Sequence, residues 1–585
     1  MITHISSDQR RTSKYIAVHC PLTLILLLPI IILAACTSTA SPSRPSGTAT
    51  GMWSQANYDY ANTRDAISST LSSRNVNKLG VAWTFQVAGA SLYGALATSP
   101  IVVNGIAYLQ DLQSNVYAIN LASGALKWEK LYNASIVGPN GVAVDQGKVF
   151  VASSSETIAA LDAATGTQLW SRQIPRPDIQ GIDQQLTAYH GTLYLSTTPG
   201  TGITSFYRGG EMGIIYAFDE QTGSIKWSFN TVKDGNLWGN PQVNSGGGAW
   251  YPPAIDTSTG MTYWGIGNAS PYPGTQQYPN GSSRPGPNLY TDSELALNPS
   301  GQLQWYQQIK PHGLFDDDFE ASPILTTATV KGVRKQVVIG SGKLGYVVAF
   351  DTRTGQQVWK TSVGMHENDE TQNIPAGQTI TVLPGGYGGV ETPMALANGV
   401  VYVPIVNAAA QFSATSIVGQ ELPKGTGELD AIDVNTGKIL WASPLQAADV
   451  GGATVAGDLV FTSTYTGQVL AFNRSSGQQV WSWQSPVGIN SPLTVVGDMV
   501  LIPAGLGSSS GETPMLIALK VGATGTIGAN NWLPILIGVL IGVVVVVVPV
   551  VALILQGRRK RKGRPPTSSP REYSAPSPSQ SNSTR

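Results

Sequence analysis

The chain has 585 residues, of which 65 are glycine, and only 12% are charged, with 35 basic side chains balanced by 35 acidic ones. The absence of a basic excess argues against a nucleic-acid-binding protein, and the glycine content favours an all-β fold rich in turns. The two cysteines, Cys20 and Cys36, exclude a disulfide framework, a CxxC zinc site and a CxxCH haem site.

Residues 1–35 have the features of an export signal. A short basic stretch precedes the apolar run "PLTLILLLPIIILAAC", which is typical of a signal peptide for general secretion. The sequence "LAAC" (Leu33 to Cys36) resembles a bacterial lipobox, in which cleavage leaves Cys36 as a lipidated N-terminus. An uncleaved anchor and ordinary cleavage nearby are the alternatives. Residues 36–52 are rich in Ser, Thr and Pro and are predicted to form a flexible tether.

Between residues 53 and 520 a short motif repeats, as in "IAALDAATGTQLW", with an Asp or Asn, a turn glycine and a final tryptophan. Each copy predicts two strands joined by a tight turn. One four-stranded sheet per tryptophan predicts an eight-bladed β-propeller, in which N- and C-terminal strands complete a shared blade. These tryptophans are predicted to be structural: Trp83, Trp128, Trp170, Trp227, Trp305, Trp359, Trp441 and Trp481.

The spacing of the repeats is uneven. The gaps from Trp227 to Trp305 and from Trp359 to Trp441 are nearly double the shortest gap. Long insertions are therefore predicted there, and insertions in repeat folds collect on a binding face. The first insertion contains "NSGGGAWYPPAID", with three glycines directly before Trp250. A bare backbone beside a large ring predicts a site for a flat ligand.

Polar residues of the first insertion gather in a few places. Successive carboxylates, as in "FDDDFE", repel one another unless they are solvated or share a cation. Oxygen ligands from Asn and Asp suit a hard cation such as Ca²⁺, and a solvated turn is the alternative interpretation. The polar residues are Asn268, Asp292, Glu294, His312, Asp316, Asp317 and Asp318.

The combination "GGGAW…GIGN…RPGPNLYT…PHGLFDDD…GKLGYVVAFD" resembles the quinoprotein dehydrogenases. The tryptophan repeats and the opening "NYDYANTRDAISSTLSSRNVNKLGVAWTF" also resemble that family over most of the chain. Its members are propellers that hold pyrroloquinoline quinone (PQQ) on their axis beside Ca²⁺ or a lanthanide. The resemblance implies an enzyme that oxidises an alcohol or sugar by hydride transfer to the quinone. Because no haem motif is present, electrons are expected to pass to a separate acceptor, a cytochrome or a membrane quinone.

The resemblance also implies residues that bind the cofactor. Trp250 resembles the tryptophan on which the quinone stacks, and Gly247 and Gly248 would leave room for its ring. Lys343 matches the Lys or Arg that hydrogen-bonds the quinone oxygens, and Asn407 resembles a further quinone contact. The alternatives are a core ring for Trp250 and a surface charge for Lys343.

A second set of residues is implied for the metal and for catalysis. Asp316 matches the catalytic base, which also binds the metal, and Asn268 matches the amide ligand. Asp318 resembles the extra carboxylate of lanthanide-using members, although calcium-type glucose dehydrogenases share the same spacing. Glu211 is the nearest candidate for the metal-binding glutamate, about three residues closer to its repeat than in the family. The alternative for Asn268 is a turn residue.

Some family features are absent. The chain lacks the adjacent cysteine pair of alcohol-oxidising members, and Val450 replaces a tryptophan near the end of the propeller. A second interpretation is therefore a non-catalytic propeller that acts as a binding or assembly scaffold at the membrane surface.

The C-terminal part predicts a membrane anchor. Residues 521–532 form a linker, and residues 533–556 are uncharged and long enough to span a bilayer of about 30 Å. The sequence "GRRKRKGR" follows, so residues 557–585 are predicted to be a basic, disordered cytoplasmic tail. The propeller is accordingly expected on the extracytoplasmic side of the cell membrane.

Overall fold

The computed structural model describes residues 52–175, 181–199, 209–420, 422–506 and 513–527. The chain divides into Met1–Thr48 and Ala49–Arg585, and every described element belongs to the second unit. The predicted export signal, Cys36, the transmembrane segment and the tail lie outside the described residues. Within the described ranges, no helix has the length and apolar character needed to cross a membrane.

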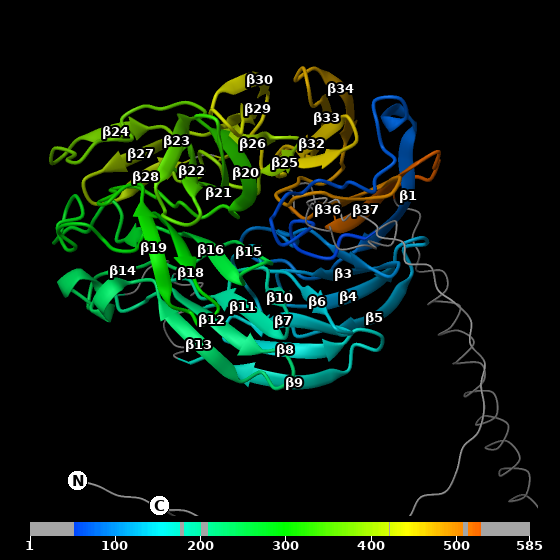
Figure 1. The fold of residues 1–585 in the computed structure, drawn as a ribbon, viewed down its shortest axis with the longest axis horizontal. Helices are drawn as coiled ribbons and strands as arrows, with labels where there is room; N and C mark the ends of the chain where they lie inside the picture. Colours follow the sequence, from blue (N-terminus) through cyan, green and yellow to red (C-terminus); the bar gives the residue numbers. More distant parts are fainter. Residues whose placement is uncertain (1–51, 176–180, 200–208, 421, 507–512, 528–585) are drawn as a thin grey trace, which may run out of the picture. The chain divides into compact units, whose positions relative to one another are not determined.

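The described residues form eight four-stranded antiparallel sheets, here called blades, arranged around a common centre (Figure 1). This agrees with the predicted all-β propeller architecture. The first four blades comprise β2 (Ile101–Val103), β3 (Ile106–Gln110), β4 (Val116–Asn120) and β5 (Leu126–Lys130); β6 (Ala143–Asp145), β7 (Lys148–Ser154), β8 (Thr157–Asp162) and β9 (Gln168–Gln173); β10 (Thr187–Tyr189), β11 (Thr192–Ser196), β12 (Ile214–Asp219) and β13 (Ile225–Asn230); and β15 (Ala254–Asp256), β16 (Met261–Ile266), β18 (Ser293–Leu297) and β19 (Leu303–Gln308).

The next three blades follow the same plan. They comprise β20 (Ile324–Val330), β21 (Val333–Ser341), β22 (Tyr346–Asp351) and β23 (Gln357–Ser362); β25 (Ala395–Ala397), β26 (Val400–Asn407), β29 (Thr426–Asp433) and β30 (Ile439–Leu445); and β31 (Thr454–Ala456), β32 (Leu459–Ser463), β33 (Gln468–Asn473) and β34 (Gln479–Gln484). The first strands of successive blades contact one another, as β2 with β6 and β31 with β35, and are therefore the innermost strands.

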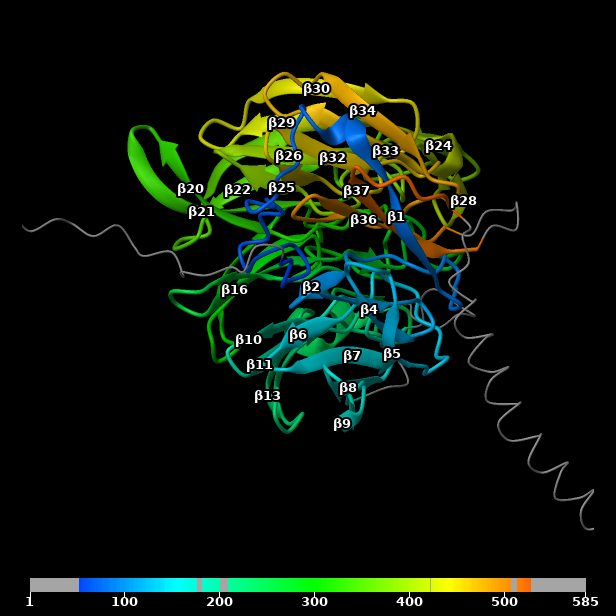
Figure 2. The same ribbon diagram turned by 90° about the vertical axis from the view of Figure 1, so that its right-hand side faces the viewer.

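The last blade joins the two ends of the propeller, as predicted. Its strands are β35 (Thr494–Val496), β36 (Met499–Ala504), β37 (Met515–Val521) and β1 (Leu79–Gln86), and β1 pairs with β37 in antiparallel register. Figure 2 shows these two strands side by side although they lie far apart in the sequence. The pairing closes the ring of blades through backbone hydrogen bonds between strands from opposite ends of the propeller.

The hydrophobic core lies between neighbouring blades. Tyr194 of the third blade, for example, packs in one cluster with Trp264 and Leu295 of the fourth. Another cluster joins Tyr117 of the first blade to Leu501 of the closing blade. Each blade therefore buries its two faces against its neighbours, which explains why the inner strands are apolar on both faces.

Seven of the eight repeat tryptophans fasten one blade to the next. Trp128 Nε1 donates a hydrogen bond to Ala163 O at 2.9 Å. Gly166 of that same turn has a φ of +72°, and a Cβ there would lie 2.6 Å from the Trp128 ring. Both the backbone conformation and the ring contact thus require glycine. The same contact recurs in the pairs Trp83–Gly124, Trp170–Gly223, Trp227–Gly301, Trp305–Gly355, Trp359–Gly437 and Trp441–Gly477.

The repeated Asp or Asn stabilises the turn backbone, as predicted. Asp162 Oδ1 accepts hydrogen bonds from the backbone N–H groups of Ala164 and Thr165, at 3.1 and 2.9 Å. Such Asx turns place the glycine at the position that needs a positive φ.

The N-terminal segment, residues 53–66, ties inner strands together. Its backbone bonds inner strands of several blades, including Val102 of β2 and Val455 of β31. Arg64 is fully buried and donates to Ala453 O at 2.7 Å and Leu493 O at 2.6 Å. Burial lowers the pKa of this guanidinium to about 9.

The two predicted insertions carry the remaining elements and contact each other. Asn280 in the first insertion bonds Ala414 O and Ile374 O of the second. These hydrogen bonds join the two insertions to each other. The elements are η3 (Lys233–Gly235), η4 (Leu237–Gly239), β14 (Ser245–Gly246), β17 (Ala269–Ser270), β24 (Thr379–Val382), β27 (Ala410–Ser413), β28 (Ile417–Gln420) and η5 (Leu422–Lys424), and η1 (Val76–Lys78) precedes β1.

Candidate cofactor site

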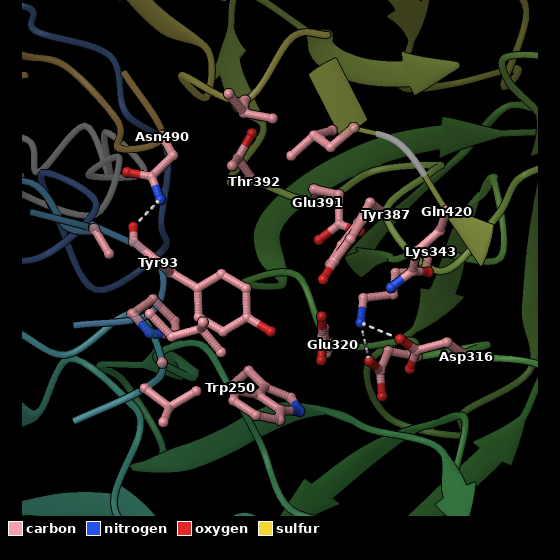
Figure 3. A pocket seen from close by; sticks show the side chains of 18 of the residues that line it. Tyr93, Trp250, Asp316, Glu320, Lys343, Tyr387, Glu391, Thr392, Gln420 and Asn490 are labelled. Atoms are coloured by element: carbon pink, nitrogen blue, oxygen red, sulfur yellow. Dashed lines mark hydrogen bonds and ion pairs between the residues drawn. The ribbon is translucent and has the colours of Figure 1, made fainter. Parts of the chain in front are cut away.

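A cavity of about 840 Å³ opens where the loops before the innermost strands converge. These loops come from most of the blades, so the cavity lies over the centre of the propeller. One wall is aromatic and apolar, and the facing wall carries the charged groups (Figure 3). The cavity is lined by, among others, Tyr93, Trp250, Asp316, Asp318, Glu320, Lys343, Tyr387, Glu391, Gln420 and Val450.

The acidic wall comes from the extended segment between β19 and β20. Successive side chains of an extended chain alternate in direction, and Asp316, Asp318 and Glu320 all line the cavity. Asp317 points away, and its carboxylate lies 3.2 Å from Lys310 Nζ in a buried ion pair. The segment therefore presents three carboxyl groups to the cavity and anchors itself with the fourth.

Lys343 lies between two of these carboxylates. Its Nζ is 2.7 Å from Asp318 Oδ2 and 3.2 Å from Asp316 Oδ2, and only 14% of its side chain is exposed. Burial by itself lowers the pKa of this ammonium, but the carboxylates of Asp316 and Asp318 outweigh burial and raise it well above its ordinary value. Lys343 is thus a buried, charged site residue rather than a surface charge.

The environment of Asp316 suits proton transfer. Burial raises the pKa of its carboxyl group, the Lys343 ammonium opposes that effect, and the result is about 7. A carboxyl group whose pKa is close to neutral can gain and lose a proton under working conditions.

Trp250 forms the floor of the cavity. In Figure 3 its indole lies below Tyr93 and Glu320, and Asp316 lies farther to the right, next to the Lys343 ammonium. A Cβ at Gly138 would lie 3.0 Å from Trp250 Cζ3, and one at Gly267 would lie 3.2 Å from its Nε1. The ring is wedged by glycine backbone and half-buried against the cavity, so it is not an inner-core ring.

The glycines before Trp250 have a different role from the predicted one. Gly247 and Gly248 do not line the cavity. A Cβ at Gly247 would lie 2.2 Å from Thr231 Oγ1, and one at Gly248 would lie 2.3 Å from Thr197 O. With φ values of +77° and +91°, these glycines are required by close packing of the chain on itself. The expectation that they make room for a ligand ring is corrected.

Asn268 lies beside the acidic segment. Its backbone N–H donates to Asp318 Oδ1 at 2.6 Å, and its Nδ2 donates weakly to Phe315 O at 3.4 Å. The predicted amide ligand and the predicted carboxylate ligand are therefore neighbours. Within the described ranges, no cluster of three or more His, Cys, Asp or Glu side chains is arranged to hold a metal ion.

Two predicted residues do not line the cavity. Glu211 is buried, and its backbone carbonyl accepts a hydrogen bond from the N–H of Gly246 in β14 at 3.1 Å. Asn407 uses its amide within the protein, because Nδ2 donates to Glu428 Oε1 at 3.1 Å and Oδ1 accepts from Met365 N at 2.8 Å. The structure thus gives Asn407 a structural role and places Glu211 outside the cavity wall.

The other polar residues of the first insertion also point elsewhere. Glu294 is fully buried on β18, where a Cβ at Gly340 would meet its Oε2 at 2.5 Å. Asp292 is buried too, and neither residue lines the cavity. His312 Nδ1 lies 3.1 Å from Gly286 O.

Several cavity residues were not predicted. Glu320 could have been predicted from the sequence, because it follows Asp316 and Asp318 at the two-residue spacing of side chains on one face of an extended chain. No sequence pattern indicated Glu391 or Tyr93 as cavity residues, because their loops belong to other blades and only folding brings them to the cavity. Burial raises the pKa of the Glu391 carboxyl to about 8.

Two family models match the chain. The model for the β-propeller domain of glucose, ethanol and alcohol dehydrogenases matches residues 200–373, which include most of the cavity's charged wall. The model for the outer membrane protein assembly factor BamB matches residues 60–229 and 425–522.

Curated relatives match over most of the chain. A quinohemoprotein alcohol dehydrogenase of Pseudomonas putida, ADH IIB, is 27% identical over 85% of this chain and 80% of its own length. A lanthanide-dependent methanol dehydrogenase of Methylorubrum extorquens is 26% identical over 74% of this chain and 82% of its own. The chain is thus similar to quinoprotein alcohol dehydrogenases over most of its length.

Solved structures support the quinoprotein fold. The alcohol dehydrogenase ADHIIG of P. putida HK5 superposes with a TM-score of 0.72 at 22% identity, covering 82% of this chain and 81% of that one. A europium-containing methanol dehydrogenase superposes with a TM-score of 0.69 at 20% identity, covering 80% and 98%. At these identities the likeness concerns the fold.

Proposed function

We propose that this quinoprotein-type propeller is a PQQ- and metal-dependent dehydrogenase that oxidises an alcohol or a sugar. The observation that carries the proposal is the convergence of Trp250, Asp316 and Lys343 at one cavity over the propeller centre. These residues lie far apart in the sequence, and packing of the blades alone does not require them to meet. The names of two relatives that match most of the chain, a quinohemoprotein alcohol dehydrogenase and a lanthanide-dependent methanol dehydrogenase, support the same activity.

The cavity residues fit the quinone. PQQ is a planar aromatic tricarboxylate, and an indole floor stacks on such a ring system. Lys343 offers an ammonium, and the buried oxygens Glu391 Oε1, Glu320 Oε2 and Gln420 Oε1 have no hydrogen-bond partner among the described residues. Unpartnered polar atoms in a cavity wall are the groups that a polar ligand satisfies. Trp250 and Lys343 would hold the cofactor.

The oxygen-rich side of the cavity fits a hard cation. Asp316, Asp318 and the neighbouring Asn268 offer carboxylate and amide oxygens, the ligands that Ca²⁺ prefers. A lanthanide ion takes the same kind of ligand. These three residues would hold the metal, and Glu211 stays a prediction from the sequence.

The chain's own residues supply the remaining chemistry. When bound, the quinone beside its metal supplies an acceptor for the hydride that leaves the substrate carbon. Asp316 accepts the proton of the substrate hydroxyl at its carboxylate, so that the alcohol becomes a carbonyl product. Lys343 orients that carboxylate through the 3.2 Å contact, and the aromatic wall with Tyr93 excludes water.

The test is cofactor binding and turnover by the full-length chain. PQQ with Ca²⁺ or with La³⁺ is added, and dye reduction is measured with a panel of alcohols and aldoses. We expect binding and turnover that Trp250→Ala weakens by at least about tenfold and that Trp250→Phe largely retains, because the phenyl ring keeps a stacking surface. Binding that is indifferent to Trp250→Ala would contradict the proposal.

A second candidate is a non-catalytic scaffold. The BamB model matches the blades on both sides of the insertions, and the matched ranges contain none of the charged residues that line the described cavity wall. A scaffold predicts no PQQ binding at any metal concentration and no dye reduction.

The location is proposed from the sequence. Export, lipidation of Cys36, the segment 533–556 and its basic tail would place the propeller outside the cell membrane, where a separate cytochrome or membrane quinone collects electrons. Cys36→Ser should abolish incorporation of labelled fatty acid. Protease added outside intact cells should digest the propeller and leave the tail.

A further inference from the structure

The cavity has an unusual charge balance for the proposed cofactor. Its described wall carries four carboxyl groups, and the only ammonium or guanidinium group among the described wall residues is that of Lys343. PQQ brings further carboxylates, and like charges at short range are strongly unfavourable in a buried site. A metal ion held by Asp316 and Asp318 would offset part of this charge. The two other acids, Glu320 and Glu391, therefore need a different way to avoid repulsion with the cofactor carboxylates.

Glu391 is the acid best placed to do so. It lies on the loop before β25, apart from the acidic segment, and Tyr251 Oη donates to its backbone carbonyl at 2.7 Å. Its Oε1 is buried and has no partner among the described residues. In Figure 3 its side chain points into the cavity beside Tyr387, opposite Tyr93.

The groups that face Glu391 determine its protonation. Burial is the largest influence and raises its pKa, the Lys343 ammonium lowers it, and Asp316 and Asp318 raise it, giving about 8. Glu320 shares this wall, and Tyr251, Tyr387 and Tyr93 bring neutral phenols. At neutral pH the Glu391 carboxyl is therefore protonated and can donate a hydrogen bond.

We propose that Glu391 binds PQQ as a neutral carboxylic acid that donates its O–H to a cofactor carboxylate. A neutral donor replaces repulsion between two anions by a charge-assisted hydrogen bond. The proposal rests on the proposed function, because it assumes that PQQ is the ligand of the cavity.

The proposal fixes the sign of a pH effect on affinity. The bound cofactor favours the protonated form, so its presence raises the pKa of Glu391 above the value in the free protein. Affinity is therefore constant with respect to Glu391 below pH 8 and falls by roughly tenfold per pH unit above it, because one proton must be taken up. Burial also raises the pKa of Asp316 to about 7, so the Glu391 contribution must be isolated by substitution.

The test compares PQQ affinities of wild type, Glu391→Gln and Glu391→Ala full-length chains from pH 6 to pH 10. Quenching of tryptophan fluorescence reports binding, with and without Ca²⁺. The amide of Glu391→Gln donates at every pH, so affinity at pH 7 should stay within about threefold of wild type and the fall above pH 8 should disappear. Glu391→Ala should bind on the order of tenfold more weakly at pH 7.

A control variant and a calorimetric measurement separate failure of this inference from failure of the proposed function. Glu129→Gln on the exposed face of β5 should keep the wild-type pH profile. Calorimetry at pH 9 in two buffers should show proton uptake that Glu391→Gln loses. An unchanged pH profile in Glu391→Gln, or tighter binding by Glu391→Ala, would overturn the inference while leaving the proposed function intact. No PQQ binding by wild type at any pH would overturn the proposed function, and this inference with it.

Discussion

Tryptophan packs against glycine both at the junctions between blades and in the wall of the central cavity, but the two kinds of tryptophan differ in what their rings contact. At a junction, a tryptophan donates to a carbonyl of the next repeat and rests on a turn glycine, and the arrangement recurs from Trp83 to Trp441. In the cavity, Trp250 is wedged between Gly138 and Gly267 and leaves its face open. A ring that is satisfied by the protein is structural, and a ring with an open face is available to a ligand.

The same contrast applies to acids. Asp162 is satisfied by the turn backbone of its own repeat. Glu391 and Glu320 have oxygens without a partner in the described structure. The turn backbone therefore gives Asp162 a structural role, whereas the cavity oxygens of Glu391 and Glu320 are open to a ligand.

The largest expected effect is in the cavity. Asp316→Asn removes the carboxylate that would accept the substrate proton and keeps the size of the side chain. We expect turnover to fall by about 10²–10⁴-fold, while PQQ binding is retained within a few-fold. Turnover is measured by dye reduction at saturating cofactor. Retained turnover would show that Asp316 is not the base.

A smaller effect is expected at a junction. Gly166→Ala places a methyl group against the Trp128 ring and forces a residue with a Cβ to a φ of +72°. We expect a loss of about 2–4 kcal/mol in the free energy of unfolding, measured by urea denaturation. The matched control is Gly147→Ala in the same blade, where φ is +74° and a Cβ meets nothing within 4 Å. Equal losses in both variants would show that backbone strain, not the ring contact, dominates.

The smallest effect concerns a buried acid of a blade. Burial is the main cause that raises the pKa of Asp430 to about 7, and its Oδ1 has no partner in the described residues. Because the folded state favours the protonated form, stability should fall as pH rises from the ordinary pKa of 3.8 through about 7. Asp430→Asn should remove about 1–2 kcal/mol of this fall, seen in unfolding curves at several pH values. Identical pH profiles would mean that Asp430 is ionised in the fold.

Much of the fold could be predicted because each blade contains a copy of the same short sequence motif. The turn Asp or Asn, the glycine and the tryptophan recur together, and each part has a local physical reason. The pairing of β1 with β37 also followed, since the incomplete repeat at Trp83 needed strands from the other end. The glycines of the opening motif could not be interpreted locally, because their close neighbours, Thr197 and Thr231, come from another blade.

The sequence by itself determined the blades, the tryptophan junctions and the acidic segment whose alternate residues share one face. Only the tertiary structure decided which of those side chains meet. It brought Lys343 between Asp316 and Asp318, set Glu391 and Tyr93 across from them, and directed Asn407 to Glu428 instead. The physical reason is range: a turn or an alternation is fixed by a few neighbouring residues, whereas a cavity wall is assembled from loops of many blades after their faces have packed.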